Sequence, residues 1–197
     1  MYRFDIINHF IQARNYQSYL EIGTLYGASF NNVHCPIKVS VDPDRSTNAT
    51  HHMTSDEFFK QFPNARFDIV FIDGLHERNQ VYRDIHNSLK CLNPGGVIVL
   101  HDCLPTSERM QEHHTESQYG EPWTGDVWKA FVKVRTELPY EMYVVNDDMG
   151  CGVIDTTFKK VTKTNDLPTD MDAMTYHQYV ENLGTWMNVK GGVISAG

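Results

Sequence analysis

The chain has 197 residues, and 17 Lys and Arg against 25 Asp and Glu give it a formal net charge of −8. Because one domain commonly takes up roughly 100–200 residues, the length predicts one domain with an ordinary core. An acidic chain without a Lys/Arg cluster is a poor partner for nucleic acid, and no apolar run reaches the roughly 18 residues of a membrane span. Residues 1–5 lack the apolar stretch of a secretory signal, so we expect a cytoplasmic protein without nucleic-acid or membrane partners.

The predicted elements alternate between helix and strand. Apolar spacing predicts a helix over residues 4–11, and strands are predicted at 18–23, 37–42, 51–54 (weaker), 67–74 and 97–100. Further helices are predicted after Gly27 (short), from the capping box of Thr54 and Glu57, and over 76–92. The irregular segment 103–123 is interpreted as a lid, followed by a helix capped by Thr124, a hairpin over 140–157 and a last amphipathic helix from about Ala173 to Leu183.

Strands that alternate with helices indicate an α/β doubly wound sheet that is mostly parallel. In such sheets ligands bind beyond the carboxyl ends of the strands. The predicted strand ends carry polar residues or glycine, namely Gly23, Asp42, Asp73, and the pair His101 and Asp102. We therefore expect these residues to gather at one edge of the sheet.

The turn after the first predicted strand is glycine-rich, with the sequence Glu21-Ile22-Gly23-Thr24-Leu25-Tyr26-Gly27. Glycines there let backbone N–H groups approach a ligand closely, and Asp42 follows at the end of the next strand, where an acid can accept hydrogen bonds from a ribose diol. A nicotinamide dinucleotide site would need glycine where Leu25 stands. The spacing E-x-G-x-x-x-G is instead typical of enzymes that use S-adenosylmethionine.

Between Tyr19 and Thr157 the chain resembles a class I S-adenosylmethionine-dependent methyltransferase. The most specific segments are FDIVFIDGLH at 67–76, then Asp84, then LNPGGVIVLHD at 92–102. They are similar to small O-methyltransferases that are encoded among glycan and antibiotic tailoring enzymes. The resemblance implies a Rossmann-like seven-stranded sheet, mostly parallel with an antiparallel last strand, and helices on both faces.

The resemblance also divides the chain and assigns roles within it. It implies a methyltransferase domain over residues 1–160, with the lid at 103–123, and a C-terminal connector and helical appendage over 161–197. It implies cofactor contacts from Glu21, Gly23, Thr24 and Gly27 around the methionine part, Asp42 at the ribose, and Thr54, Ser55 and Asp56 near the adenine. We expect Asp73 near the sulfonium or the metal. One departure is the segment 43–49, which is too short for the usual crossover helix.

Asp73, His76 and His101 are the predicted catalytic residues. Methyl transfer to a hydroxyl needs an acceptor that is held in line and deprotonated or polarised, and a histidine or an aspartate can do either. We expect His101 to act as the general base or to orient the acceptor. Related enzymes hold Mg²⁺ at these strand ends, so Asp73, His101 and Asp102 form a candidate site for Mg²⁺ or another divalent cation.

The leading hypothesis is S-adenosylmethionine-dependent O-methylation of a small hydroxylated acceptor such as a sugar or a tailored metabolite. Three rivals stay open: a protein that binds the cofactor as a non-catalytic partner of a glycan enzyme, an NAD(P)-dependent oxidoreductase, and a metal-dependent hydrolase. Trp123 and Trp128 suit an acceptor pocket, although Trp128 fits the core equally well. The pairs His51-His52 and His113-His114 are expected on strand surface and lid, respectively. The segment from Met171 either closes over the site or pairs two subunits in a homodimer.

Overall fold

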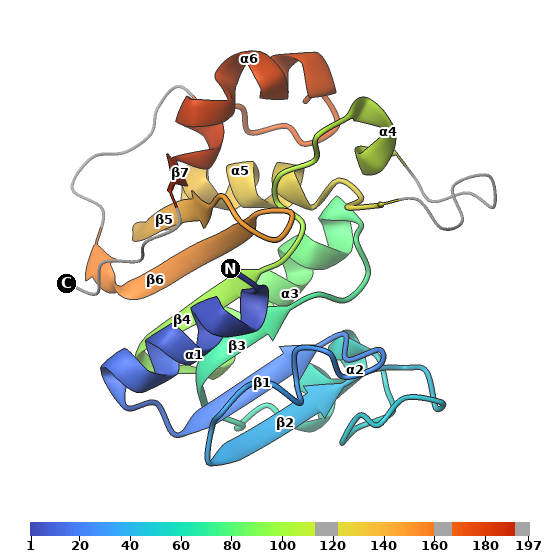
Figure 1. Cartoon of the computed structure of the whole chain (residues 1–197), viewed down its shortest axis with the longest axis vertical. Helices are drawn as coiled ribbons and strands as arrows, with labels where there is room; N and C mark the ends of the chain where they lie inside the picture. The colour runs from blue at the N-terminus through green and yellow to red at the C-terminus, as the bar shows by residue number, and fades with distance from the viewer. Residues whose placement is uncertain (113–121, 160–166, 192–197) are drawn as a thin grey trace.

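Within residues 1–112, 122–159 and 167–191, which the computed structural model describes, seven strands form one sheet in the order β2-β1-β3-β4-β6-β5-β7 (Figure 1). The strands are β1 (Ser18–Ile22), β2 (Ile37–Val41), β3 (Phe67–Ile72), β4 (Leu92–Leu100), β5 (Tyr140–Val145), β6 (Cys151–Lys159) and β7 (Val189–Lys190). β6 pairs antiparallel with both β4 and β5, whereas the other neighbouring strands pair in parallel. The predicted mostly parallel α/β sheet is confirmed.

Helices cover both faces of the sheet. They are α1 (Arg3–Arg14), α2 (Ser55–Gln61), α3 (Arg78–Cys91), α4 (Glu108–Gln111), α5 (Val127–Glu137) and α6 (Tyr176–Met187). The apolar side chains of α1 pack with one set of strand residues, and those of α2, α3, α5 and α6 pack with the other set. Because β3 and the second half of β4 are buried on both faces, their near-continuous apolar sequences are those of central parallel strands.

The register of the parallel strands brings their ends into line. Ile22 of β1 lies opposite both Val41 of β2 and Ile72 of β3, and Ile72 lies opposite Leu100 of β4. The residues that follow these four therefore emerge side by side at one edge of the sheet. They are Gly23, Asp42, Asp73 and His101.

The strand predicted at 51–54 is wrong. The segment after β2 makes only a single bridge, between Val41 and His51, and Thr50 exchanges hydrogen bonds with Ser40. Too few residues lie between β2 and this point for a crossover helix, so the chain turns back along the sheet edge without adding a strand. The seventh strand is instead β7, a two-residue strand that the sequence did not predict and that pairs with β5.

Three local predictions also need correction. No helix follows Gly27; hydrogen-bonded turns occupy that stretch. β4 begins at Leu92, directly after α3, so the Asn-Pro-Gly-Gly segment is part of the strand. The cap residue of α5 is Asp126, because the hydroxyl of Thr124 donates to the backbone oxygen of Met110.

The described part of the C-terminal appendage joins the same sheet. β7 extends it beside β5, and Trp186 of α6 stacks on Trp128 of α5. Trp128 is fully buried, so of the two alternatives for this residue the core is correct. None of the helices in the described ranges is long and apolar enough to cross a membrane.

Candidate functional site

A cavity of about 770 Å³ opens at the carboxyl ends of β1, β2, β3 and β4. Its wall includes nearly all of the predicted cofactor and catalytic residues: Glu21, Gly23, Thr24, Asp42, Thr54, Ser55, Asp56, Asp73, His76, His101 and Asp102. Gly27 lies outside this wall and shapes the turn instead, with a φ of 74° and an N–H that donates to the oxygen of Thr24. The structure thus brings together residues that are spread over 82 positions, from Glu21 to Asp102.

Gly23 lets the end of β1 lie directly against the end of β3. Its φ is 85°, and a Cβ at this position would lie 2.1 Å from the backbone oxygen of Asp73. Its N–H also donates to the oxygen of Val41, which ties the turn to β2. Only glycine fits such a conformation and such a close approach.

Asp42 holds the glycine-rich turn in place. Its Oδ2 accepts hydrogen bonds from the backbone N–H groups of Thr24 at 3.0 Å and Leu25 at 2.8 Å, and its Oδ1 accepts one from Asp44 at 2.9 Å. Leu25 has a φ of 44°, which the two hydrogen bonds help to fix. Since a carboxylate has about four acceptor positions, Asp42 keeps capacity for a ligand hydroxyl.

Two further polar side chains in the cavity wall are available to a ligand. The hydroxyl oxygen of Thr24 is buried and has no hydrogen-bond partner within the described part of the chain. Glu21 is buried and accepts a hydrogen bond from the hydroxyl of Tyr19, and burial raises its pKa to about 8. Buried polar groups are normally paired, so Thr24 fits a ligand that offers it a polar partner.

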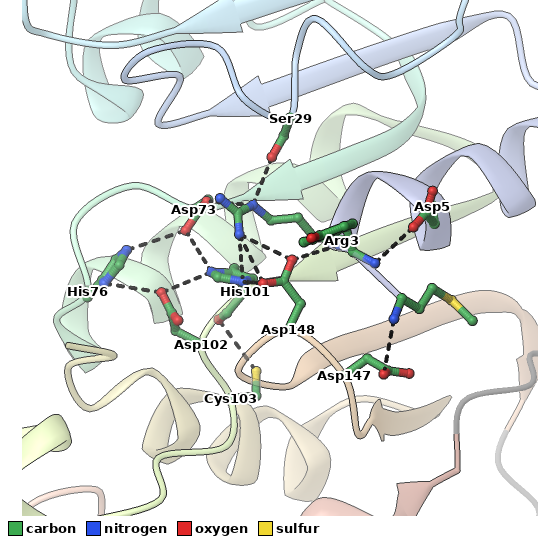
Figure 2. A network of polar contacts seen from close by, with 12 residues as sticks. Arg3, Asp5, Ser29, Asp73, His76, His101, Asp102, Cys103, Asp147 and Asp148 are labelled. Atoms are coloured by element: carbon green, nitrogen blue, oxygen red, sulfur yellow. Dashed lines mark hydrogen bonds and ion pairs between the residues drawn. The ribbon is translucent and has the colours of Figure 1, made fainter. Parts of the chain in front are cut away.

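Two aspartates and two histidines form a closed ring of contacts at the other end of the cavity (Figure 2). Oδ1 of Asp73 lies 3.3 Å from Nδ1 of His101 and 3.4 Å from Nε2 of His76. Oδ2 of Asp102 lies 3.1 Å from Nδ1 of His101 and 3.3 Å from Nδ1 of His76. Asp102 reaches this position through a left-handed backbone conformation, with a φ of 61°.

The charges in this ring stabilise one another. Burial opposes ionisation of Asp73, but hydrogen bonds from His101 and His76 hold its pKa well below the usual range. Burial likewise disfavours charge on His101, yet Asp102, Asp148 and Asp73 raise its pKa to about 11. The pKa of His76 is also raised, because Asp73 and Asp102 outweigh its burial. At neutral pH His101 is therefore an imidazolium with no lone pair to accept a proton.

Arg3 and Asp148 complete the cluster, and sequence reasoning missed both (Figure 2). One guanidinium nitrogen of Arg3 lies 3.2 Å from Nε2 of His101 and 3.2 Å from Oδ2 of Asp148, and Nε donates to the hydroxyl of Ser29 at 2.9 Å. Burial opposes ionisation of Asp148, but His101 and Arg3 lower its pKa to about 2. Arg3 comes from α1 and Asp148 from the β5–β6 turn, so their meeting depends on tertiary structure that the local pattern does not encode.

The residues after the lid hold His76 in place. Trp123 stacks on its ring, with centroids 4.9 Å apart and an interplanar angle of 21°. Gly125 has a φ of 59°, and a Cβ there would lie 1.9 Å from the backbone oxygen of His76. Asp126 donates from its N–H to that same oxygen and accepts from the N–H of Arg78. The structure places Trp123 in the cavity wall.

The acidic end of the cavity also offers a donor set for a metal. One ligand atom each from Asp73, His76 and Asp102 lie within 4.8 Å of one another. Two carboxylates and an imidazole suit a divalent cation, with the nitrogen favouring a borderline metal over Mg²⁺. This set shares Asp73 and Asp102 with the predicted one, but His76 stands where His101 was expected.

The remaining predicted residues have structural roles. Thr54 caps α2 through a reciprocal capping box with Glu57, as the spacing predicted. His51 packs against the rings of Phe58 and Phe62 rather than lying on a strand surface. His113, His114 and most of the lid lie outside the described residues.

Comparisons with known proteins agree with this fold. Residues 41–103, about a third of the chain, match the family model of a methyltransferase domain. This segment runs from the last residue of β2 through β3, α3 and β4, and so carries Asp42, Asp73, His101 and Asp102. No curated protein matches the sequence.

Solved O-methyltransferases share the architecture. TomG from Streptomyces achromogenes, an O-methyltransferase involved in tomaymycin synthesis and solved with SAM, has a TM-score of 0.59 at 16% identity over 79% of this chain and 80% of that chain. The O-methyltransferase from Bacillus cereus, solved with SAH, has a TM-score of 0.57 at 16% identity over 78% and 80%. The SAH-bound methyltransferase PaMTH1 from Podospora anserina has a TM-score of 0.54 at 15% identity over 78% and 77%.

Residues 41–103 therefore match a methyltransferase domain, and the chain shares its Rossmann-like fold with solved methyltransferases. The resemblance found in the sequence is thereby confirmed at the level of fold and of the domain match. Because these structures share only 16% identity or less with this chain, they show the architecture and do not specify the acceptor.

Proposed function

We propose that this protein is an S-adenosylmethionine-dependent O-methyltransferase that acts on a small hydroxylated acceptor. The observation that carries the proposal is a single cavity with two different ends. One end has the glycine-rich turn held by Asp42, and the other has the ring of Asp73, His76, His101 and Asp102. The first end suits an adenosyl group, and the second suits proton removal beside a positive sulfur.

The residues fit the cofactor by their chemistry. Bound S-adenosylmethionine supplies an electrophilic methyl group on a positively charged sulfur. Asp42 accepts hydrogen bonds from the ribose diol, and the unpartnered hydroxyl of Thr24 pairs with a polar group of the ligand. Asp73 and Asp102 place negative charge near the sulfonium, which favours binding of the charged cofactor over its neutral product.

We assign the general base to His76 rather than to His101. Both nitrogens of His101 face charged groups, and a pKa of about 11 keeps it protonated, so it serves to hold Asp73 and Asp102 in position. The pKa of His76 is raised as well, so the base is the neutral form of His76, and turnover should rise with pH. The Nε2 contact of His76 with Asp73 is 3.4 Å, longer than a normal charge-assisted hydrogen bond, so an acceptor hydroxyl can replace it. The acceptor hydroxyl would then give its proton to Nε2 of His76, and bound S-adenosylmethionine would supply the methyl group and leave as S-adenosylhomocysteine.

Asp73, His76 and Asp102 would also hold a divalent cation. A bound cation would lower the pKa of the acceptor hydroxyl and orient it. Such a cation would occupy His76 as a ligand, so metal-assisted and His76-assisted proton removal are alternatives that a chelator separates.

The acceptor is a neutral hydroxylated molecule such as a sugar or a tailored metabolite. Apolar side chains that are exposed to solvent lie in the cavity wall, namely Leu25, Tyr26, Leu75 and Met149. They provide contact for the body of such a molecule, and the acidic end disfavours an anionic one. We also propose that the protein forms a homodimer, is cytoplasmic and has no nucleic-acid partner.

The test is transfer of a labelled methyl group from S-adenosylmethionine to a panel of sugars and hydroxylated metabolites, with and without chelator. We expect a methylated hydroxyl product from the wild type and at least about a hundredfold lower turnover from His76→Gln, within the range for a lost general base. SAH binding without transfer to any acceptor would favour the rival role as a non-catalytic partner. Equal turnover by wild type and His76→Gln without metal would overturn the assignment of the base.

A further inference from the structure

Asp84 is a buried acid in the cavity wall that has no role in the proposed chemistry and does not lie at the end of a strand. It lies on α3, and only 1% of its surface is exposed. Its neighbours on the buried face of α3 include Val81 and Ile85, which belong to the core. Burial raises the pKa of Asp84 to about 6, and nearby Asp56 adds to the effect.

Asp84 belongs to a small polar group with Ser55 and Gln80. The side-chain nitrogen of Gln80 donates to Oδ1 of Asp84 at 3.0 Å and to the hydroxyl oxygen of Ser55 at 3.1 Å. All three residues line the cavity. Two neutral partners compensate a buried carboxylate poorly, since a buried charge is usually matched by an opposite charge or a ligand.

The position of this group limits what can reach it. Ser55 begins α2, which follows the loop after β2, so Ser55, Gln80 and Asp84 lie on the Asp42 side of the cavity. The ring of Asp73, His76, His101 and Asp102 lies at the ends of the neighbouring strands β3 and β4. In an adenosyl ligand the ribose joins the sulfur to the base. With the ribose at Asp42 and the sulfur toward Asp73, the base falls toward Ser55, Gln80 and Asp84.

We propose that Asp84, supported by Gln80 and Ser55, accepts a hydrogen bond from the exocyclic amino group of adenine and makes the cavity selective for an adenine nucleoside. The inference rests on the proposed function. An ionised carboxylate only accepts hydrogen bonds, so it matches the 6-amino group of adenine and opposes the 6-oxo group of hypoxanthine. This assignment differs from the sequence-based one, in which Thr54, Ser55 and Asp56 surround the adenine.

Asp56 is the competing acid in the same wall. Its side chain is 49% exposed and contacts Nε of Arg83 at 3.5 Å, so water and a cation already satisfy it. A solvated acid discriminates between ligands far less than a desolvated one, because water compensates a mismatched group. Replacing Asp84 or Asp56 with asparagine should therefore have different effects on the preference for adenine.

The experiment compares two ligands that differ at one atom of the base. Dissociation constants for S-adenosylhomocysteine and for S-inosylhomocysteine, which has a 6-oxo group, are measured by isothermal titration calorimetry. The proteins are the wild type, Asp84→Asn, Asp56→Asn and Asp155→Asn. Asp155 is a buried acid that pairs with Arg14 and lies outside the cavity wall, so it controls for the loss of a buried charge.

We expect the wild type to bind the adenine ligand at least about tenfold more tightly, as for a hydrogen bond to a charged group. Asp84→Asn offers an amide that can donate to the 6-oxo group, so the ratio of the two constants should fall by about tenfold or more. Asp155→Asn and Asp56→Asn should leave the ratio within about twofold of wild type.

Several outcomes overturn the inference. A wild-type ratio near one does so even if Asp84→Asn fails to fold. An unchanged ratio in Asp84→Asn, or a lost preference in Asp56→Asn alone, does so while leaving the methyltransferase proposal intact. Binding of neither ligand by the folded wild type removes the proposed function itself, and the inference with it.

Discussion

Replacing Asp42 with alanine tests whether one side chain both holds the glycine-rich turn and binds the ribose. The carboxylate accepts backbone hydrogen bonds from Thr24 and Leu25, at 3.0 and 2.8 Å. Alanine leaves both N–H groups without this acceptor, and Leu25 loses the contact that fixes its left-handed conformation. Asparagine keeps one oxygen as an acceptor but removes the charge.

The size of the effect follows from the two lost hydrogen bonds. Leaving the buried N–H of Thr24 unpaired costs about 1–3 kcal/mol, and losing the hydrogen bond of the part-buried N–H of Leu25 costs about 1 kcal/mol, so Asp42→Ala should destabilise the protein by about 2–4 kcal/mol. For a chain of this size each kcal/mol shifts Tm by about 2–4 °C, which gives a fall of roughly 5–15 °C. We expect a smaller fall for Asp42→Asn, and weaker binding of S-adenosylhomocysteine by both variants.

Thermal denaturation and calorimetric titration with S-adenosylhomocysteine, both at pH 7.5, measure the two effects separately. Asp44→Ala is the matched control, because Asp44 is exposed and accepts a hydrogen bond from the nearby N–H of Ser46. It should change Tm far less than Asp42→Ala does. An unaltered Tm in Asp42→Ala would refute the role in the turn, and unaltered ligand affinity would refute the role at the ribose.

Two other substitutions test the acidic end of the cavity. Gly125→Ala places a Cβ against the backbone oxygen of His76, so we expect turnover to fall by about a hundredfold while the affinity for SAH stays within about threefold of wild type. Gly184→Ala is the control and should be neutral, because open space surrounds Gly184. Equal kinetics for the two variants would contradict the role of Gly125 in positioning His76. His101→Gln tests the ion pairs of His101, whose folded pKa of about 11 lies above the unfolded value of about 6.5. The difference in free energy of unfolding between wild type and this variant should be largest below about pH 6.5 and should disappear as pH rises toward 11. Urea unfolding at several pH values measures this difference. A difference that grows with pH would contradict the prediction.

The sequence predicts the residues at the sheet edge more completely than it predicts the charged cluster beside them. The polar ends of the strands are local signals, and parallel pairing places Gly23, Asp42, Asp73 and His101 side by side without further information. The same applies to the capping box of α2 and to the hairpin of β5 and β6. These features depend on spacing along the chain or on a general rule of parallel sheets.

Arg3, Asp148 and Asp84 were not predicted as site residues, because packing of distant elements brings Arg3 and Asp84 into the cavity wall and Asp148 against Arg3 and His101. Arg3 is an ordinary first residue of a helix until α1 lies against the β5–β6 turn, and Asp84 is one more polar residue of α3 until α2 packs beside it. Our proposal moves the base from His101 to His76 for a related reason. A histidine at a strand end suggests a base, but three carboxylates from separate segments, Asp73, Asp102 and Asp148, favour its imidazolium form.

Calorimetric titration of the wild-type protein with S-adenosylhomocysteine and, separately, with NAD⁺ tests the central claim most directly. The account predicts one SAH site per chain, a dissociation constant at least about a hundredfold lower than for NAD⁺, and weakened SAH binding in Asp42→Asn. Tighter binding of NAD⁺ would favour the rival function of an NAD(P)-dependent oxidoreductase, despite Leu25 in the glycine-rich turn. Binding of neither ligand by the folded protein would contradict the assignment of this cavity as a methyl-donor site.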